Sequence, residues 1–259
     1  MNHTLRSRWR ILRDMMYPPR CMFCNRVLDF DSELRLCPTC QTVGGIRTIS
    51  ETTDRRCAVC SRPLHKDNER LCATCEALCR TLAGHATFAY DGDVKLAIKQ
   101  FKYDLIRDDA ETMAHLMTSP KELQSVPWRA PYFLAYAPAH PKRERERGFN
   151  QARLMAEALS EILNVPIYHG LRRGVETRAL KTLGAIDREA SMKDAIYADP
   201  TVPMPIGTAV IVDDIYTTGS TVAACAQAIL SRDPKRPCFF WTFSIRPDVP
   251  CKKRDAVLR

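Results

Sequence analysis

The sequence contains no run of about 18 apolar residues, the length that a helix needs to cross a bilayer. Its start also lacks the uninterrupted apolar core of a secretory signal peptide. We therefore expect a cytosolic protein without a membrane span. The basic start carries Trp9, Leu12 and Met15 between its arginines. This pattern favours a terminal helix docked on the protein, with a helix that lies on a surface or directs targeting as the alternative.

The composition excludes a disordered chain. Of the 259 residues, 45% are hydrophobic and 27% are charged, which is enough to build a core in one large domain or two unequal ones. Lys and Arg outnumber Asp and Glu, for a net charge of +9. This excess favours anionic partners such as phosphates or nucleic acid, without choosing between them.

Cysteine is plentiful, with 12 residues, and a chain without an export signal is not expected to use them as a disulfide scaffold. Eight of them form four C-x-x-C pairs in two successive segments, CNRVLDFDSELRLCPTC and CSRPLHKDNERLCATC. The segments match with one deletion, sharing the Arg after the first pair and the RLC at the second, and so form an internal duplication. The paired cysteines are Cys21, Cys24, Cys37 and Cys40, then Cys57, Cys60, Cys72 and Cys75.

Two C-x-x-C pairs supply four thiolates, the ligand set of a closed, tetrahedral, structural zinc site. We therefore expect two structural Zn²⁺ ions, with no open position for catalysis by the metal. The spacing leaves open whether each repeat binds its own ion or the pairs cross between repeats. The tandem arrangement is favoured because each repeat is complete. We expect Cys79 and Cys225 to be small buried residues and not ligands.

The composition changes near Gly84 from cysteine-rich to α/β in character. We predict an N-terminal helix with the zinc repeats over residues 1–85 and a second domain over residues 86–259. There, strand-like runs alternate with helical spacing, which predicts a mainly parallel sheet with helices on both faces and ligand sites beyond the carboxyl ends of the strands. Expected strands cover 85–90, 132–139, 165–170, 210–212 and 238–245; expected helices cover 94–101, 108–118 and 151–163, and one begins near 221.

The segment AVIVDDIYTTGST, residues 209–221, leads from an apolar run through two aspartates into a hydroxyl-rich loop and a helix. A helix N-terminus binds anions through its unpaired N–H groups, and Gly219 permits close approach or a positive φ. The ionised carboxylates of Asp213 and Asp214 accept hydrogen bonds from neighbouring hydroxyls. A ribose 5-phosphate matches this pattern, with its phosphate on Thr217, Thr218, Gly219, Ser220 and Thr221.

A second loop is expected over residues 137–152, APAHPKRERERGFNQA, after another buried strand. Such a mixed run of Arg and Glu is commonly a solvated turn. Its place after a strand favours a second interpretation, contact with a pyrophosphate through charge-assisted hydrogen bonds. The cations that would make this contact are Lys142, Arg143, Arg145 and Arg147.

These motifs resemble two known families. The 209–221 segment is similar to the phosphoribosyl-pyrophosphate (PRPP) motif of type I phosphoribosyltransferases. Together with RERGFNQA, IKQFKY and the C-x-x-C repeats, it makes nearly the whole chain resemble the ComF family, also called GntX-like. The family pattern places Gln and Asn where Leu180 and Ser191 stand here, while Thr177 and Arg188 fit it.

The resemblance implies a zinc-binding module on a type I phosphoribosyltransferase-like domain, a PRPP site that uses Mg²⁺, and a role in DNA uptake during natural transformation. Two functions follow. The chain either binds PRPP or a related ribose phosphate as an accessory protein, with single-stranded DNA and DNA-uptake proteins as partners, or it transfers the phosphoribosyl group to a base or another nucleophile. In the second case Asp213 and Asp214 are the expected catalytic residues.

Overall fold

The computed structural model describes residues 16, 18–29, 32–41, 46–64, 69–77, 81–103, 109–174 and 196–246. Several predictions therefore lie outside the described residues: the N-terminal helix, Cys79, and the stretch that holds Thr177, Leu180, Arg188 and Ser191. In the part of the chain that is described, no helix has both the length and the apolar character needed to span a membrane.

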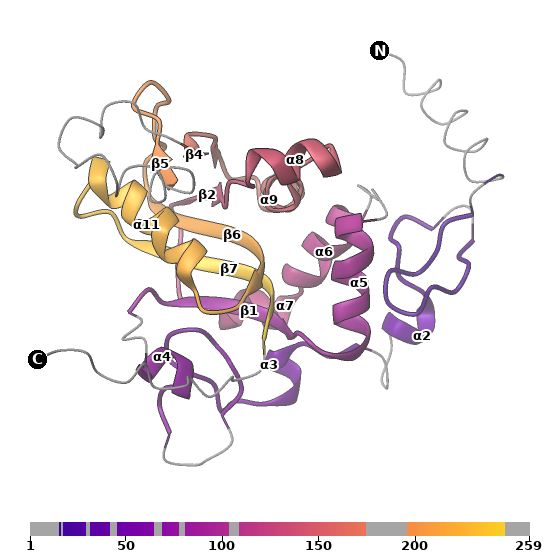
Figure 1. Ribbon diagram of the computed structural model, residues 1–259. Coiled ribbons are helices and arrows are strands. Elements are labelled where there is room, and N and C mark those ends of the chain that lie inside the picture. Colours follow the sequence, from indigo (N-terminus) through magenta and orange to yellow (C-terminus); the bar gives the residue numbers. More distant parts are fainter. Residues whose placement is uncertain are drawn as a thin grey trace, which may run out of the picture.

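A five-stranded parallel sheet forms the centre of the molecule (Figure 1), with the strand order β1-β7-β6-β2-β3. Its apolar, largely β-branched and aromatic strands are covered on both sides, as is typical of parallel sheets. The predicted α/β class is thus confirmed. The strands are β1 (Gly84–Ala89), β2 (Tyr132–Tyr136), β3 (Ile167–Tyr168), β6 (Thr208–Tyr216) and β7 (Cys238–Ile245).

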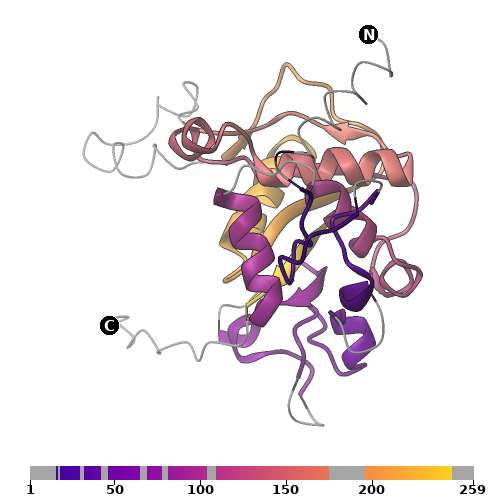
Figure 2. The same cartoon turned by 90° about the vertical axis from the view of Figure 1, so that its right-hand side faces the viewer.

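Helices cover both faces of this sheet (Figures 1 and 2), with α11 on one face and α9, backed by α6, on the other. Asn150 caps α9 as predicted, because its side chain accepts a hydrogen bond from the Arg153 amide. Cys225 on α11 is fully buried, also as predicted. The helices are α5 (Gly92–Tyr103), α6 (Asp109–Met117), α7 (Pro120–Ser125), α8 (Pro141–Arg147), α9 (Gln151–Leu163) and α11 (Ser220–Arg232).

Four elements differ from the prediction. Strand β6 does not stop before the aspartates but continues through them to Tyr216, because β7 pairs with it along that length. The expected charged loop contains the helix α8, which begins with a proline and ends at Gly148 in the left-handed conformation. A small antiparallel pair, β4 (Leu171–Arg173) and β5 (Ile196–Ala198), lies against α11 and was not predicted.

The cysteine-rich segment precedes the sheet, and its described residues form isolated β-bridges and short helical turns. The turns are α2 (Pro38–Gln41), α3 (Ile49–Thr52), which lies between the repeats, and α4 (Ala73–Ala77). The first repeat packs beside α6, where Arg35 forms an ion pair of 3.0 Å with the buried Asp109. The second repeat packs under β1, where the Gly84 amide donates to the Val59 carbonyl at 2.8 Å. Both repeats therefore rest on the α/β domain, at different places (Figure 1).

Candidate functional site

Each cysteine repeat brings its own four sulfur atoms together. In both groups all Sγ atoms lie within 4.8 Å of one another, and every cysteine except Cys24 is buried. The tandem arrangement is therefore correct, and the crossed alternative is wrong. Four thiolates at this spacing fit a tetrahedral S4 site, which confirms the prediction of two structural Zn²⁺ sites.

The backbone repeats as closely as the sequence does. The Cys21 amide donates to the Arg26 carbonyl at 2.8 Å, and the equivalent Cys57 amide donates to the Arg62 carbonyl, also at 2.8 Å. At the turn after each first C-x-x-C pair, Asn25 and Ser61 have φ values of 60° and 59°. The first cysteine pair of each repeat is therefore followed by the same kind of turn.

The two aspartates of the candidate ligand site lie near the carboxyl end of β6. They are partly exposed, in contrast to the four fully buried residues that precede them. The Asp214 amide donates to Asp213 Oδ1 at 2.9 Å, which orients the first carboxylate. Asp214 Oδ2 lies 2.6 Å from Lys102 Nζ at the end of α5, and these side chains are 13% and 20% exposed.

Lys102 was missed as a site residue from the sequence. The segment IKQFKY indicated a helix with Lys99 and Lys102 away from its apolar face, but nothing local showed that the helix ends beside β6. Lys99 is exposed, and within the described residues it is Lys102 that reaches an aspartate. A lysine at the carboxyl end of an amphipathic helix that follows a sheet strand was the signal available.

The electrostatic state of Asp213 is unusual. Burial and the neighbouring Asp214 carboxylate raise the pKa of Asp213 to about 7, although the Asp214 amide and Lys102 oppose this change. Two adjacent carboxylates in a partly desolvated position do not both ionise easily. Asp213 therefore keeps its proton up to about pH 7, and a bound cation or hydroxyl donor would favour its ionised form.

The hydroxyl-rich segment is a three-residue turn, Thr217 to Gly219, followed directly by α11. Gly219 is the N-cap, with φ 76°, and contributes no side chain to the helix end. A Cβ at this position would collide with the hydroxyl of Tyr216, which is buried and stacked on Phe240 at 4.6 Å. Glycine is thus required both by φ and by space.

The N-terminus of α11 has the properties of an anion site. The first N–H groups of a helix have no partner within it, and the helix dipole adds positive potential there. Thr217 and Ser220 expose their hydroxyls, and Thr218 Oγ1 lies 3.1 Å from Ser220 Oγ. The structure therefore brings the predicted hydroxyls to one exposed turn, next in the chain to the two aspartates.

The predicted pyrophosphate residues lie at the same edge of the sheet. Strands β2 and β6 are neighbours, and the Ala137 amide donates to the Val212 carbonyl at 3.0 Å, directly before Asp213. Asn150 ties the other end of the segment back, because its Nδ2 donates to the Ala137 carbonyl at 3.0 Å. Helix α8 between these ties carries the four cations, of which Lys142, Arg143 and Arg145 are exposed.

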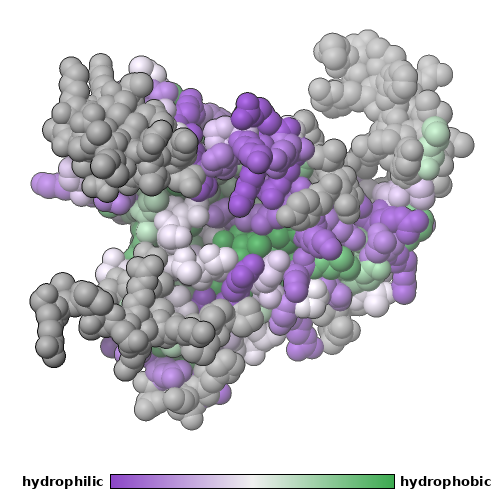
Figure 3. Space-filling model, viewed as in Figure 1, coloured by the Kyte–Doolittle hydropathy of each residue, from purple (hydrophilic) through white to green (hydrophobic). Residues whose placement is uncertain are grey.

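Arg147 is partly covered, and its Nη1 donates to Gln151 Oε1 at 3.3 Å. The space-filling view shows hydrophilic side chains gathered over α8 (Figure 3). In the part of the chain that the structure describes, the ion pair with Asp214 comes from Lys102 of α5 and not from a cation of α8.

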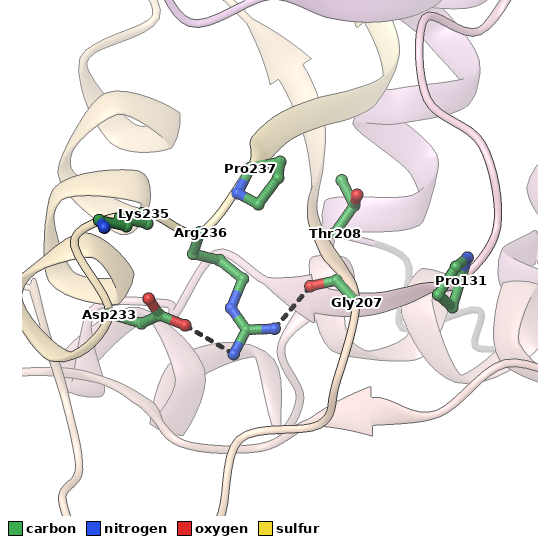
Figure 4. A pocket seen from close by; sticks show the side chains of 7 residues that line it. All are labelled: Pro131, Gly207, Thr208, Asp233, Lys235, Arg236 and Pro237. Atoms are coloured by element: carbon green, nitrogen blue, oxygen red, sulfur yellow. Dashed lines mark hydrogen bonds and ion pairs between the residues drawn. The ribbon is translucent and has the colours of Figure 1, made fainter.

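A cavity of about 400 Å³ lies at the opposite, amino-terminal edge of the sheet (Figure 4). Arg236 Nη1 donates there to the Gly207 carbonyl at 2.7 Å, and its Nη2 pairs with Asp233 at 2.8 Å. The guanidinium is already occupied by the protein itself, and ligands of parallel sheets bind at the carboxyl ends. We therefore do not assign the ligand site to this cavity. Its lining residues are Pro131, Gly207, Thr208, Asp233, Lys235, Arg236 and Pro237.

Comparison with known proteins matches these observations. The family model described as a double zinc ribbon domain matches residues 12–76. Competence protein ComFC of Bacillus subtilis (strain 168) is 24% identical over 206 residues, which cover 76% of this chain and 79% of that protein. The DNA utilization protein YhgH of Escherichia coli O157:H7 is 29% identical over 144 residues, which cover 54% of this chain and 63% of that protein. The predicted resemblance to ComF competence proteins is thus confirmed.

Among solved structures, the Helicobacter pylori xanthine-guanine-hypoxanthine phosphoribosyltransferase is similar with a TM-score of 0.32 and 11% identity, over 62% of this chain and 87% of that one. The assignment of the parallel fold rests on the strand pairing and not on this likeness.

Proposed function

We propose that this relative of the ComF competence proteins binds PRPP or a related ribose phosphate at the carboxyl edge of its sheet, as an accessory in DNA uptake. The observation that carries the proposal is the succession, within nine residues, of two partly buried carboxylates and an exposed hydroxyl turn at the N-terminus of α11. Ionised carboxylates accept hydrogen bonds from a ribose diol, and a helix N-terminus receives a phosphate.

Asp213 and Asp214 would hold the two ribose hydroxyls. Thr217, Thr218, Gly219, Ser220 and Thr221 would surround the 5-phosphate. The ligand would then either displace Lys102 from Asp214 or share the Asp214 carboxylate with it, because Asp214 Oδ2 already lies 2.6 Å from the ammonium group of Lys102. Lys102 therefore places a positive charge beside the Asp214 carboxyl group, next to the proposed ligand.

The pyrophosphate of PRPP would extend toward α8, whose Lys142, Arg143, Arg145 and Arg147 supply donors for it. Mg²⁺ would supply further neutralisation of the pyrophosphate charge, and oxygen ligands such as the carboxylates of Asp213 and Asp214 suit this hard cation. The cluster of two acidic side chains beside several cations fits a ligand that is itself a metal-bound polyanion.

An enzymatic role is favoured by one observation, the raised pKa of Asp213. A carboxyl group that titrates near 7 can accept a proton from an attacking nucleophile at neutral pH, as a general base does. The chain would then transfer the phosphoribosyl group and release pyrophosphate. Release of pyrophosphate from PRPP and Mg²⁺ in the presence of a panel of bases would establish this role, whereas binding without turnover favours the accessory role.

Single-stranded DNA and DNA-uptake proteins are the proposed macromolecular partners. The relatives named competence protein and DNA utilization protein support a link to DNA. The net charge of +9 and the exposed cations of α8 support contact with an anionic polymer. Reduced thiols at both zinc sites favour a cytoplasmic location.

Calorimetric titration of PRPP with Mg²⁺ into the wild-type protein and Asp214→Asn tests the proposal. Asparagine keeps the shape of the side chain but removes its charge and one acceptor. Losing a charge-assisted hydrogen bond costs about 1.5 to 3 kcal/mol, or roughly ten- to a hundredfold in affinity. Asp233→Asn, at the far edge of the sheet, is the matched control and should bind like wild type. No binding of PRPP, ribose 5-phosphate or a nucleotide by the wild-type protein would overturn the proposal.

A further inference from the structure

We infer that Arg62 is a positioning residue that ties the second zinc site to the turn proposed to bind phosphate. Only the identity of the ligand rests on the proposed function. The link itself is a set of contacts within the chain. It makes the shape of the Thr217–Gly219 turn depend on zinc at the second site, and not at the first.

The Arg62 guanidinium contacts three separate parts of the molecule and is only 2% exposed. Its Nη1 donates to Cys72 Sγ at 3.0 Å, within the second zinc site. Its Nε donates to the Arg246 carbonyl at 2.9 Å, at the end of β7. Its Nη2 donates to the Thr217 carbonyl at 3.3 Å, the first residue of the turn.

These contacts hold the turn at its base. The Arg246 amide donates to the Tyr216 carbonyl at 3.0 Å, the last hydrogen bond between β6 and β7. The two carbonyls that Arg62 binds, those of Thr217 and Arg246, lie directly after this bond. A planar guanidinium with several fixed donors can bind both carbonyls and the Cys72 sulfur at once, whereas a single ammonium group cannot. Arg62 therefore fixes where β6 ends and where the turn begins.

Zinc at the second site strengthens this arrangement. A cysteine that ligates zinc is a thiolate, and the bond from Arg62 to Cys72 is then charge-assisted. Without the metal, the four sulfur atoms of the site are no longer held together, and Cys72 no longer fixes the position of Arg62 Nη1. One of the contacts that hold the guanidinium against the base of the turn is then no longer fixed, and the turn is less restrained.

Because the two cysteine repeats are duplicates, equivalent residues in them can be compared directly. Arg26 occupies the position equivalent to Arg62, but it is exposed, and its Nη1 donates to Thr39 Oγ1 of the same repeat at 3.3 Å. The first ribbon rests on α6 through Arg35 and Asp109 instead. The equivalent arginines have thus taken different roles, and only Arg62 contacts the phosphate-binding turn.

The experiment compares Arg62→Met with the matched control Arg26→Met, and adds Arg62→Lys to keep the positive charge. Zinc content and circular dichroism establish that each variant is folded and holds two zinc ions. Hydrogen exchange of peptides covering residues 213–225 reports on the turn without ligand. Calorimetry with PRPP and Mg²⁺ reports on binding.

We expect Arg62→Met and Arg62→Lys to exchange faster over 213–225 and to bind PRPP about tenfold more weakly, while Arg26→Met behaves like wild type. Removing zinc from the wild-type protein with a chelator should accelerate exchange in the same peptides. Exchange and affinity unchanged in both Arg62 variants would overturn the inference. If the wild-type protein does not bind PRPP but its Arg62 variants exchange faster, the link stands and the proposed function fails.

Discussion

Lys102 Nζ lies 2.6 Å from Asp214 Oδ2 and so places the end of α5 against the acidic pair of β6. Both side chains are partly buried, where an ion pair is screened less than at the surface. The positive charge also lowers the pKa of the neighbouring Asp213, against the opposing effects of burial and Asp214. Lys102 is therefore part of the electrostatics of the candidate site.

Replacing Lys102 by Met should weaken PRPP binding by about tenfold, the equivalent of about 1.4 kcal/mol, because two adjacent carboxylates then repel a polyanion without compensation. Lys102→Arg keeps the charge and should restore most of the affinity. Lys99→Met removes an exposed lysine from the same helix and is the matched control. Calorimetry that finds equal losses for Lys99→Met and Lys102→Met would refute a specific role for Lys102.

The raised pKa of Asp213 predicts a pH dependence of stability. The folded state binds this proton up to about pH 7, whereas the unfolded chain releases it near 3.8. The contribution of Asp213 to the free energy of unfolding is therefore full below 3.8, decreases as pH rises toward 7 and is lost above it. Asp213→Asn removes this dependence and should raise the free energy of unfolding at pH 8 by about 2 to 4 kcal/mol relative to wild type.

Urea denaturation of the two proteins at pH 5 and pH 8 measures this difference, which should be smaller at pH 5. A gap of the same size at both values would mean that Asp213 does not titrate between them. Binding should follow the opposite trend. PRPP affinity of the wild-type protein should increase from pH 6 to pH 8, because only the ionised carboxylate accepts both ribose hydroxyls.

The zinc ligands were predictable because the C-x-x-C spacing alone identifies them. Two C-x-x-C pairs per repeat left only tandem or crossed pairing open, and each complete repeat proved to be its own site. The strands of the sheet were also predictable, because short apolar runs such as 238–245 are typical of strands buried in a parallel sheet. The order of those strands, however, is a property of packing between distant segments.

The parts of the candidate site that the sequence did not indicate depend on such long-range contacts. Within their own segments, Lys102 and Arg62 are ordinary basic residues. Their roles arise because the end of α5 and the second cysteine repeat lie beside β6 and β7 in the folded chain. Helix α8 was missed for a different reason. Its run of Lys, Arg and Glu has no apolar face, so periodicity could not distinguish a short exposed helix from a charged loop.

Purified protein should contain about two zinc ions per chain, as eight thiolates in two S4 sites require. Cys57→Ser should lower this to about one, because three cysteines do not complete the second site. We propose a domain boundary near residue 85, so the sheet should stay folded in this variant while the second ribbon loosens. Cys238→Ser, a cysteine outside both sites, should keep two ions.

Metal analysis reports on the zinc sites. Thermal unfolding followed by tryptophan fluorescence in a Trp9→Phe background reports on the α/β domain, which holds the other two tryptophans, Trp128 and Trp241. Loss of both zinc ions together with the cooperative transition of the sheet would contradict the proposed boundary.

The cations of α8 offer the most direct test of a nucleic-acid partner. Changing Arg143, Arg145 and Arg147 together to Gln should weaken binding of single-stranded DNA, because each lost phosphate contact removes released counterions from the binding equilibrium. The slope of log affinity against log salt should flatten by roughly 2, at roughly 0.7 for each contact. Lys121→Gln, an exposed lysine on α7, should leave the slope unchanged. A triple variant that keeps the wild-type slope but loses PRPP affinity would assign α8 to pyrophosphate alone, since a DNA contact cannot be removed without changing the salt dependence.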